Sequence, residues 1–314
     1  MDKDIISVIV PCYNEQETIG IYYSEFTKII DKIDGADYEL IFVDDGSADN
    51  TMNEIKKLSA RSDKVKYISF SKNFGKEAAI YAGLKYSSGD YICTMDVDLQ
   101  DPIELLCDMY SEIKKGEYDI IAAYRTDRKG EGKIKSALSE LFYKIINKIS
   151  NTEFVSGARD FRLMTRRVAN SVLSVTEYNR FSKGIFSWVG YKTKWLGFEN
   201  VERSAGKTKW NYFKLFKYSL DAIIAFSTVP LAIASVLGLL FCFTAFVMIL
   251  VIIIKTLVWG DPVAGYPSMM CFMFLLSGVQ MFSIGIIGQY LSKTYMEVKG
   301  RPIFIAKESN INEV

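Results

Sequence analysis

The chain has 314 residues, enough for one large domain or two small ones, and its 38 Lys and Arg nearly balance its 37 Asp and Glu. A net charge of +1 argues against a protein that binds nucleic acid or another polyanion over its whole surface. The chain has no histidine, and its five cysteines show no CxxC spacing, which argues against a zinc cluster.

The first 125 residues alternate short β-rich runs with amphipathic runs. Strands are predicted at 5–11, 38–45, 64–70, 90–96 and 118–124, and helices near 16–33, 50–60, 76–87 and 103–115. Strands that alternate with helices indicate an α/β fold with a mostly parallel sheet covered on both faces.

Polar clusters follow three of the predicted strands. PCYNE ends the first strand, DDGS ends the second and DVDLQDP ends the fourth. Because ligands of such sheets bind beyond the carboxyl ends of the strands, we expect these clusters to meet on one rim and to form the site.

The stretch DVDLQDP suits a metal ion. Asp96 and Asp98 are two residues apart, so in an extended segment both side chains point the same way and can face one cation. Carboxylate oxygens suit Mg²⁺ or Mn²⁺, and Gln100 could add a neutral oxygen. The alternative is a solvated turn before a helix, and we expect Asp101 to be the N-cap of that helix with Pro102 at its first position.

The other two clusters suit a nucleoside. Asp44, at the end of the second strand, could accept hydrogen bonds from a ribose or a base, although a capped turn would use the same residues. Tyr13 could stack on a base, and Glu15 could accept a hydrogen bond from a hydroxyl.

Two further amphipathic segments follow a basic, glycine-containing loop at 125–133. The segment 134–150 fits either a core-packing helix or a helix docked on a membrane surface, and the sequence leaves both open. The segment 209–222 mixes lysines with aromatic residues just before a long apolar run, which favours a helix lying on the membrane surface.

Two long apolar runs predict a membrane hairpin. Residues 222–254 and 262–292 carry no charged side chain, and each run exceeds the roughly 20 residues that span a bilayer. Lysine and arginine flank both outer ends, whereas the connecting loop 256–267 has neither, which predicts that both ends are cytoplasmic. The spans are expected at about 229–254 and 268–292. Small residues such as Gly285 and Gly288 would permit close helix packing in a homo-oligomer. The alternative to membrane spans is that both apolar runs form helices buried in a protein core.

Taken together, several stretches resemble a known family. SVIVPCYNEQETI, FVDDGSADNT, SKNFGKEAAIYAGL, DVDLQDP, GARDFRLM and RSAGKTKW resemble the family 2 glycosyltransferases of the GT-A fold. They resemble most the polyprenyl-phosphate branch, which includes dolichol-phosphate mannose synthases and bacterial undecaprenyl-phosphate glucosyl- and N-acetylglucosaminyltransferases. The segment GIIGQYLSKTYMEVKGRPIFI is similar to the bacterial members, and the resemblance extends over 5–306.

The resemblance implies a role for each matching residue. The nucleoside would be held by Pro11, Tyr13, Glu15 and Asp44. The divalent metal, Mg²⁺ or Mn²⁺, and the diphosphate would be held by Asp96, Asp98 and Gln100. The acceptor phosphate would meet Arg125, Arg128 and Thr208, and the donor phosphates would meet Arg203 and Lys209. The catalytic residues would be Asp160, Asp98 and Arg203.

The resemblance also implies a reaction and an organisation. The reaction would be the inverting, metal-dependent transfer of glucose or N-acetylglucosamine from a UDP-sugar to undecaprenyl phosphate in the plasma membrane. Its partners would be the donor, the lipid, a separate flippase and a downstream glycosyltransferase, with no nucleic acid. The expected parts are a cytoplasmic catalytic domain at 1–208, a surface helix at 209–223, two transmembrane helices within 224–292, and a cytoplasmic tail at 293–314.

Other functions are compatible with the sequence. A GDP-mannose donor would use the same fold. A polysaccharide synthase would too, but such enzymes usually carry a QxxRW-type motif and more spans, and no RW pair occurs here. A binding protein with a dead site is disfavoured because Asp96, Asp98, Asp160 and Arg203 are all present.

A phosphate acceptor changes what Asp160 must do. A phosphomonoester has its second pKa near about 6 and is already ionised at pH 7, so its attack needs no strong base. We therefore expect Asp160 to position Arg162, the acceptor or a sugar hydroxyl.

Overall fold

The computed structural model describes residues 3–126, 133–150, 152–199, 212–259 and 265–311. The chain divides into two compact units. The first comprises 1–219 together with 301–314, and the second comprises 220–300. Each unit is described by itself.

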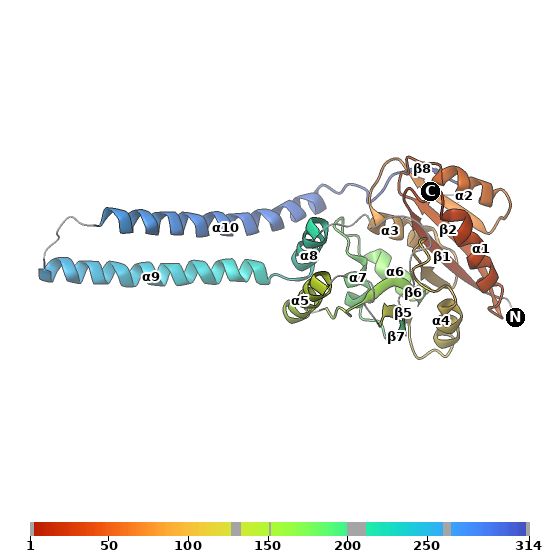
Figure 1. The fold of residues 1–314 in the computed structure, drawn as a ribbon, viewed down its shortest axis with the longest axis horizontal. Helices are drawn as coiled ribbons and strands as arrows, with labels where there is room; N and C mark the ends of the chain where they lie inside the picture. Colours follow the sequence, from red (N-terminus) through yellow and green to blue (C-terminus); the bar gives the residue numbers. More distant parts are fainter. Residues whose placement is uncertain (1–2, 127–132, 151, 200–211, 260–264, 312–314) are drawn as a thin grey trace. The chain divides into compact units, whose positions relative to one another are not determined.

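The first unit is built on one eight-stranded sheet with the order β7-β5-β6-β4-β1-β2-β3-β8. Figure 1 labels six of these strands: β1, β2, β5, β6, β7 and β8. The strands are β1 (Asp4–Cys12), β2 (Ala36–Asp44), β3 (Val65–Phe70), β4 (Tyr91–Thr94), β5 (Ile120–Arg125), β6 (Ala158–Thr165), β7 (Thr193–Phe198) and β8 (Ala306–Ser309). Strands β4, β1, β2 and β3 run parallel, whereas β6 and β8 are antiparallel to their neighbours. The predicted α/β class and the five predicted strands are confirmed.

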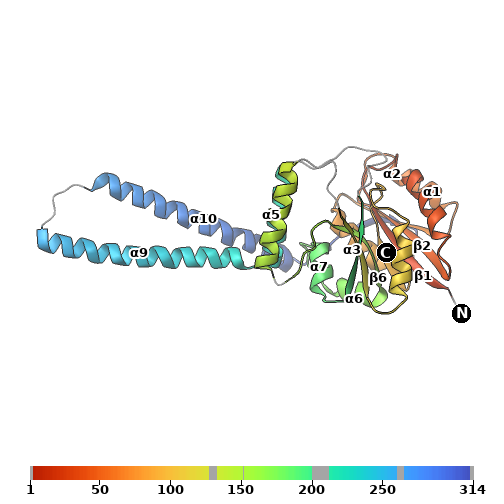
Figure 2. The same cartoon turned by 60° about the horizontal axis from the view of Figure 1, so that its bottom comes forward.

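Helices connect the strands of this sheet. They are α1 (Ile19–Ile30), α2 (Thr51–Ser59), α3 (Lys76–Tyr86), α4 (Leu105–Ile113), α5 (Lys133–Ile149), α6 (Arg166–Ser174) and α7 (Ser182–Trp188). Helix α6 follows β6 and packs against it and against β4 (Figure 2).

The core lies on both faces of the central strand β1. Ile6, Val8 and Val10 are fully buried against one layer, which contains α1 and α4, while Ile9 faces α3 on the other side. This alternation is what a strand covered on both faces requires.

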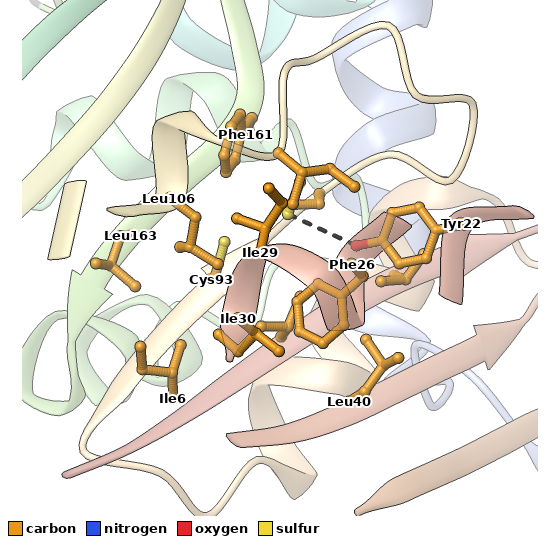
Figure 3. Packing of buried hydrophobic residues seen from close by; sticks show 14 of the residues in the cluster. Ile6, Tyr22, Phe26, Ile29, Ile30, Leu40, Cys93, Leu106, Phe161 and Leu163 are labelled. Atoms are coloured by element: carbon orange, nitrogen blue, oxygen red, sulfur yellow. Dashed lines mark hydrogen bonds between the residues drawn. The ribbon is translucent and has the colours of Figure 1, made fainter. Parts of the chain in front are cut away.

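Aromatic rings fill the space between α1 and the sheet in the first of these layers. Figure 3 shows Tyr22 and Phe26 of α1 beside Leu40 of β2, and both rings are fully buried. The Tyr22 hydroxyl donates a hydrogen bond to Met95 Sδ at 3.6 Å. The core therefore contacts the residue that immediately precedes Asp96.

The second unit consists mainly of two long helices, α9 (Val229–Trp259) and α10 (Tyr266–Val298), preceded by the end of α8 (Tyr212–Phe226). Their apolar windows, Val229–Met248 and Phe272–Val298, are long and apolar enough to cross a membrane, and neither window is buried. Large apolar side chains on both helices are exposed, for example Phe243 at 69% and Phe274 at 70%. Exposure on this scale is unfavourable in water and normal in lipid.

Two polar contacts tie the ends of this unit together. Lys293 Nζ lies 2.7 Å from Asp221 Oδ1, and the Tyr290 hydroxyl donates to the Ser227 carbonyl at 2.6 Å. They link the last turns of α10 to α8 and to the turn before α9.

Candidate active site

The carboxyl ends of β4, β1, β2 and β3 lie at one edge of the sheet, which we call the rim. The loops after β1 and β2 are bonded to each other there: Asn14 donates its backbone N–H to Ser47 Oγ at 2.9 Å, and Ala48 N–H donates to Asn14 Oδ1 at 2.9 Å. The structure therefore brings two of the predicted polar clusters into contact.

The DVDLQDP segment continues from β4 at the same rim. Met95 and Val97 are buried, with exposed fractions of 1% and 5%, whereas Asp96 and Asp98, which follow them in turn, are partly exposed. The burial alternates at these positions as the spacing predicts, although Val97 and Asp98 lie in a turn, and that both carboxylates face one cation stays a prediction. Leu99 then adopts a positive φ of 56°, which is uncommon for a residue other than glycine, and Gln100 N–H donates to Asp98 Oδ1 at 3.2 Å.

Asp160 reaches the rim on the antiparallel strand β6. The register of the two strands ends with Thr94 opposite Arg162, and Asp160 and Asp96 each lie two residues beyond this pair. The Thr94 hydroxyl also donates to the Asp160 carbonyl. The side chains of Asp96 and Asp160 are 23% and 19% exposed, which leaves both carboxylates accessible.

Lys76, the first residue of α3, joins the two carboxylates. Its Nζ lies 2.6 Å from Asp96 Oδ1 and also makes an ion pair with Asp160 Oδ2. The Lys76 side chain is 42% exposed; partial removal from water opposes the charge on its ammonium, yet the two carboxylates raise its pKa above its usual value. Burial alone would raise the pKa of Asp160, but Lys76 and Lys183 lower it well below its ordinary range. Both groups are therefore ionised at neutral pH.

Lys76 was not among the residues expected at the site. The feature that could have identified it is the polar stretch SKNFGK, which follows β3 just as the other polar clusters follow their strands.

Asp45 holds the loop that carries Lys76. Phe74 N–H donates to Asp45 Oδ1 at 2.6 Å, and Gly75 N–H donates to both of its oxygens at 3.0 and 3.1 Å. Burial raises the pKa of Asp45, and these hydrogen bonds oppose that shift. Gly75 has φ +97°, a conformation that a side chain would strain, so it sets the direction in which α3 begins.

Glu77, the next residue of α3, fixes helix α7 on the same side of the site. Ser182 donates its backbone N–H to Glu77 Oε2 at 2.8 Å and its hydroxyl to the same atom. The following residue, Lys183, donates to the Ala158 carbonyl at 2.9 Å. Burial lowers the pKa of Lys183, while Asp160 opposes that shift. A second cation is thereby brought near Asp160.

The expected N-cap role of Asp101 is wrong. Helix α4 begins at Leu105, and Asp101 instead accepts a 2.7 Å charged hydrogen bond from Arg159 Nε. Asp101 is 2% exposed, and burial raises its pKa to about 6 even though Arg159 lowers it. This ion pair fastens the end of the DVDLQDP segment to β6.

The expected nucleoside residues lie around the ends of β1 and β2. Asp44 is buried and accepts from Ser69 Oγ at 2.8 Å and from Ser47 N–H at 3.1 Å. Glu15 accepts from the Thr18 hydroxyl at 3.1 Å. Tyr13 is 39% exposed, and Pro11 is the penultimate residue of β1. Their contact with a nucleoside stays a prediction.

The predicted phosphate residues are only partly described. Arg125 is the last residue of β5, and its N–H donates to the Gly157 carbonyl at 3.1 Å, just before β6. Arg128, Arg203, Thr208 and Lys209 lie outside the described residues.

The residues present fit a divalent cation. Mg²⁺ and Mn²⁺ are commonly held by one or two carboxylates, with water and substrate phosphates completing the shell. Asp96 and Asp98, both partly exposed, supply that number, and the Lys76 ammonium at Asp96 marks this position as one that favours positive charge. Among the described residues, no group of three or more acidic, histidine or cysteine side chains is placed to hold a metal ion by itself.

Comparison with known proteins assigns the family. The profile of Glycosyl transferase family 2 matches residues 7–173. The chain belongs to this family. The protein is thus a glycosyltransferase, and its mostly parallel sheet with β6 inserted antiparallel is the GT-A fold that the motifs predicted.

Relatives match over nearly the whole chain. A prophage bactoprenol glucosyl transferase homolog of Escherichia coli K12 is 41% identical over 96% of this chain and 98% of its own. The bactoprenol glucosyl transferase of Shigella phage SfII is 40% identical over 97% and 98%. Glucosyl-3-phosphoglycerate synthase of Mycobacterium tuberculosis, a solved structure, is 21% identical with a TM-score of 0.46 over 70% of this chain and 78% of that chain. Likeness at that last level says nothing about substrates.

Gly46→Ala should impair donor use. Gly46 has φ +70°, and a Cβ there would lie 2.5 Å from the Lys72 carbonyl carbon, in the loop that leads to Lys76. We expect the variant to raise KM for the donor by about tenfold or more, because the loops after β2 and β3 must separate. Steady-state kinetics measure this.

Gly35→Ala is the matched control. Gly35 also has a positive φ, +81°, but no atom lies within 4 Å of its added Cβ, and it precedes β2 at the opposite end of the sheet. Both variants should lose about 1–2 kcal/mol of stability from backbone strain. An equal rise of KM in the two variants would contradict the role assigned to Gly46.

Lys76→Met should disable the site without unfolding the protein. The change leaves Asp96 and Asp160 without their shared counter-charge, and we expect kcat to fall by roughly 10²–10³-fold. The affinity of the nucleotide-free enzyme for Mn²⁺, measured by electron paramagnetic resonance, should rise because the ammonium no longer competes for Asp96.

Lys72→Met is the control for this experiment. Lys72 lies in the same loop, is exposed, and has its Nζ 5.0 Å from the centre of the Phe74 ring. It should leave kcat and the Mn²⁺ affinity close to wild type. Normal turnover in Lys76→Met would show that the ion pairs do not serve the reaction.

Proposed function

We propose that the protein transfers glucose from UDP-glucose to undecaprenyl phosphate in the plasma membrane, giving a polyprenyl-phosphate sugar. One observation carries the proposal: the ionised cluster of Asp96, Asp160 and Lys76 lies at the rim of a family 2 fold in a chain that also has two unburied, membrane-length helices. A lipid acceptor explains why one chain needs both. The names of relatives, bactoprenol glucosyl transferases, favour glucose and a polyprenyl acceptor.

The path of the chain supports a hairpin topology. The first unit ends at Ser219 and resumes at Arg301, and the two long helices lie between these points. Because both ends of the helical pair enter the same compact unit, the pair must cross a membrane twice or not at all. The lysines and arginines that flank the outer ends favour a cytoplasmic catalytic unit.

In the proposed reaction an oxygen of the lipid phosphate attacks the anomeric carbon, and the bond from that carbon to the nucleoside diphosphate breaks. An acceptor in line with the leaving group inverts the configuration. Asp96 and Asp98, with Gln100, would hold a divalent cation, which when bound neutralises charge on the leaving diphosphate. Lys76 and Arg125 would add fixed positive charge at the rim.

Asp160 fits a positioning role better than a basic one. Its carboxylate is paired with Lys76 and its pKa is held below the ordinary range, which makes it a weak proton acceptor. The expected partner Arg162 is occupied differently: its Nη2 donates to the Arg159 carbonyl at 2.9 Å and its guanidinium lies 4.0 Å from the centre of the Phe186 ring. We therefore assign Asp160 to holding Lys76 and a substrate group.

Asp160→Asn should lower kcat by roughly 10²-fold or more without moving the acid limb of the pH–rate profile. The lowered pKa of Asp160 means that it stays ionised at all pH values where the protein is assayed, so its protonation cannot produce an acid limb. The measurement is kcat against pH from about 5 to 9 for both proteins. Loss of an acid limb in Asp160→Asn would restore Asp160 as the general base.

Purified full-length protein with undecaprenyl phosphate and Mn²⁺ should form one glycolipid with UDP-glucose, and none with UDP-N-acetylglucosamine or GDP-mannose. Chelation of the metal and Asp98→Ala should each abolish the product, which mass spectrometry detects. Asp108→Ala, an exposed carboxylate of α4, is the control and should retain activity.

The other outcomes identify the rival functions. A product from a different donor would change the sugar and keep the reaction. Transfer to an added saccharide, with no glycolipid, would indicate a polysaccharide synthase. Product formation in the presence of chelator would remove the metal from the proposal.

A further inference from the structure

The chain after α10 becomes part of the sheet at the candidate site. Strand β8 pairs antiparallel with β3, with Ile68 opposite Ser309 and Phe70 opposite Ala306. Ser71 N–H donates to the Ile305 carbonyl at 2.9 Å, immediately beyond the carboxyl end of β3. The tail, which we define as residues 304–310, thus extends the strand ladder to the start of the loop that carries Lys76.

Side chains lock this pairing in register. Lys56 Nζ of α2 lies 2.7 Å from Glu308 Oε2. Asn310 Oδ1 accepts from Tyr67 N–H at 2.7 Å, and Asn310 Nδ2 donates to the Val65 carbonyl at 3.1 Å. A strand held by an ion pair and side-chain bonds has a defined register, unlike a loose edge strand.

Phe304 inserts its ring between β3 and α3. The ring stacks on Phe70 with centroids 4.9 Å apart and planes 20° apart. Tyr81 and Tyr86 of α3 meet it edge-on at 6.5 and 6.3 Å, and Lys85 Nζ lies 6.0 Å from its centre. One side chain of the tail therefore contacts both elements that flank the Lys76 loop.

The contact continues into the loop. Phe70 meets Phe74 edge-on at 5.7 Å, and Phe74 is the one large apolar residue in the loop SKNFG. The amides of Phe74 and Gly75 are those that donate to Asp45, and Lys76 follows directly. Phe304, Phe70 and Phe74 form a continuous row of rings that ends two residues from the ammonium between Asp96 and Asp160.

We propose that Phe304 is a positioning residue of the active site: acting through Phe70 and Phe74, it holds the loop that aims Lys76. The segment after the second apolar helix is then required for a competent site as well as for closing the sheet. The inference rests on the role proposed for Lys76 and is independent of the sugar and the acceptor.

The test compares Phe304→Ala with Ile305→Ala in the full-length protein in detergent. Ile305 is the adjacent tail residue, its side chain is 51% exposed, and the substitution keeps the carbonyl that Ser71 bonds. Hydrogen exchange of the Phe74 and Gly75 amides reports the loop, exchange of the Val8 and Val10 amides in β1 reports the rest of the unit, and donor turnover reports the site.

In Phe304→Ala we expect exchange at Phe74 and Gly75 to accelerate about tenfold or more, with β1 unchanged and kcat reduced by a similar factor. Ile305→Ala should change neither, and Phe304→Tyr should restore both because it keeps the ring. If Phe304→Ala does not fold, Phe304→Leu replaces it, since leucine stays apolar and removes the stacking.

Three results would overturn the proposal. Unchanged exchange in the loop would show that Phe304 does not hold it, whatever happens to turnover. Equally faster hydrogen exchange in β1 would show that Phe304 contributes only to the general stability of the unit. Faster loop exchange with normal turnover would show that the position of Lys76 does not limit the reaction. Because exchange needs no substrate, a wrong sugar or acceptor assignment would leave this comparison intact.

Discussion

The site depends on one lysine placed between two carboxylates. Asp96 follows β4 and Asp160 lies on the neighbouring antiparallel strand β6, and both carboxylates make ion pairs with Lys76. Two carboxylates held this close repel unless positive charge lies between them. Lys76 supplies that charge at 2.6 Å from Asp96, and so allows the rim to keep two ionised acids ready before any substrate arrives.

Much of the surrounding structure serves to hold that lysine. Asp45 fixes the loop before it through two amides, and the buried pair of Asp101 and Arg159 fixes the acidic segment opposite. These side chains differ from those expected to touch substrate. A buried charge needs a counter-charge, so the ion pair between buried Asp101 and partly buried Arg159 supports the acidic segment from behind the rim.

Those features of the fold and of the site that depend on a local residue pattern could be predicted from the sequence. Strand alternation located β1 to β5, and the two-residue spacing matches the burial of Met95 and Val97 beside the partly exposed Asp96 and Asp98. The prediction was wrong for a side chain whose bonding partner is distant in sequence. Asp101 has the local signature of a helix cap, but a charged hydrogen bond from Arg159 in β6 is available only in the folded chain.

Other elements left weaker signals. Lys76 alone is an ordinary first-turn lysine, and nothing local shows that two acids face it. Strand β6 could be found only through the family motif that carries Asp160. Strand β8 is four residues long, and its register depends on partners such as Lys56, about 250 residues earlier in the chain. Short edge strands of this kind carry little pattern of their own.

The order of the chain has a consequence for how the enzyme matures. Strand β8 is made after both apolar helices, yet it completes the sheet edge beside β3 and supplies the ring that packs on Phe70. Contacts between such distant residues require closure of a long loop, which makes them slow to form. A chain interrupted before residue 301 would contain Asp96, Asp98, Asp160 and Lys76 but would lack the support for the Lys76 loop. The membrane-length helices therefore lie inside the catalytic unit's sequence, and the active site is complete only when the segment beyond them has returned to the sheet.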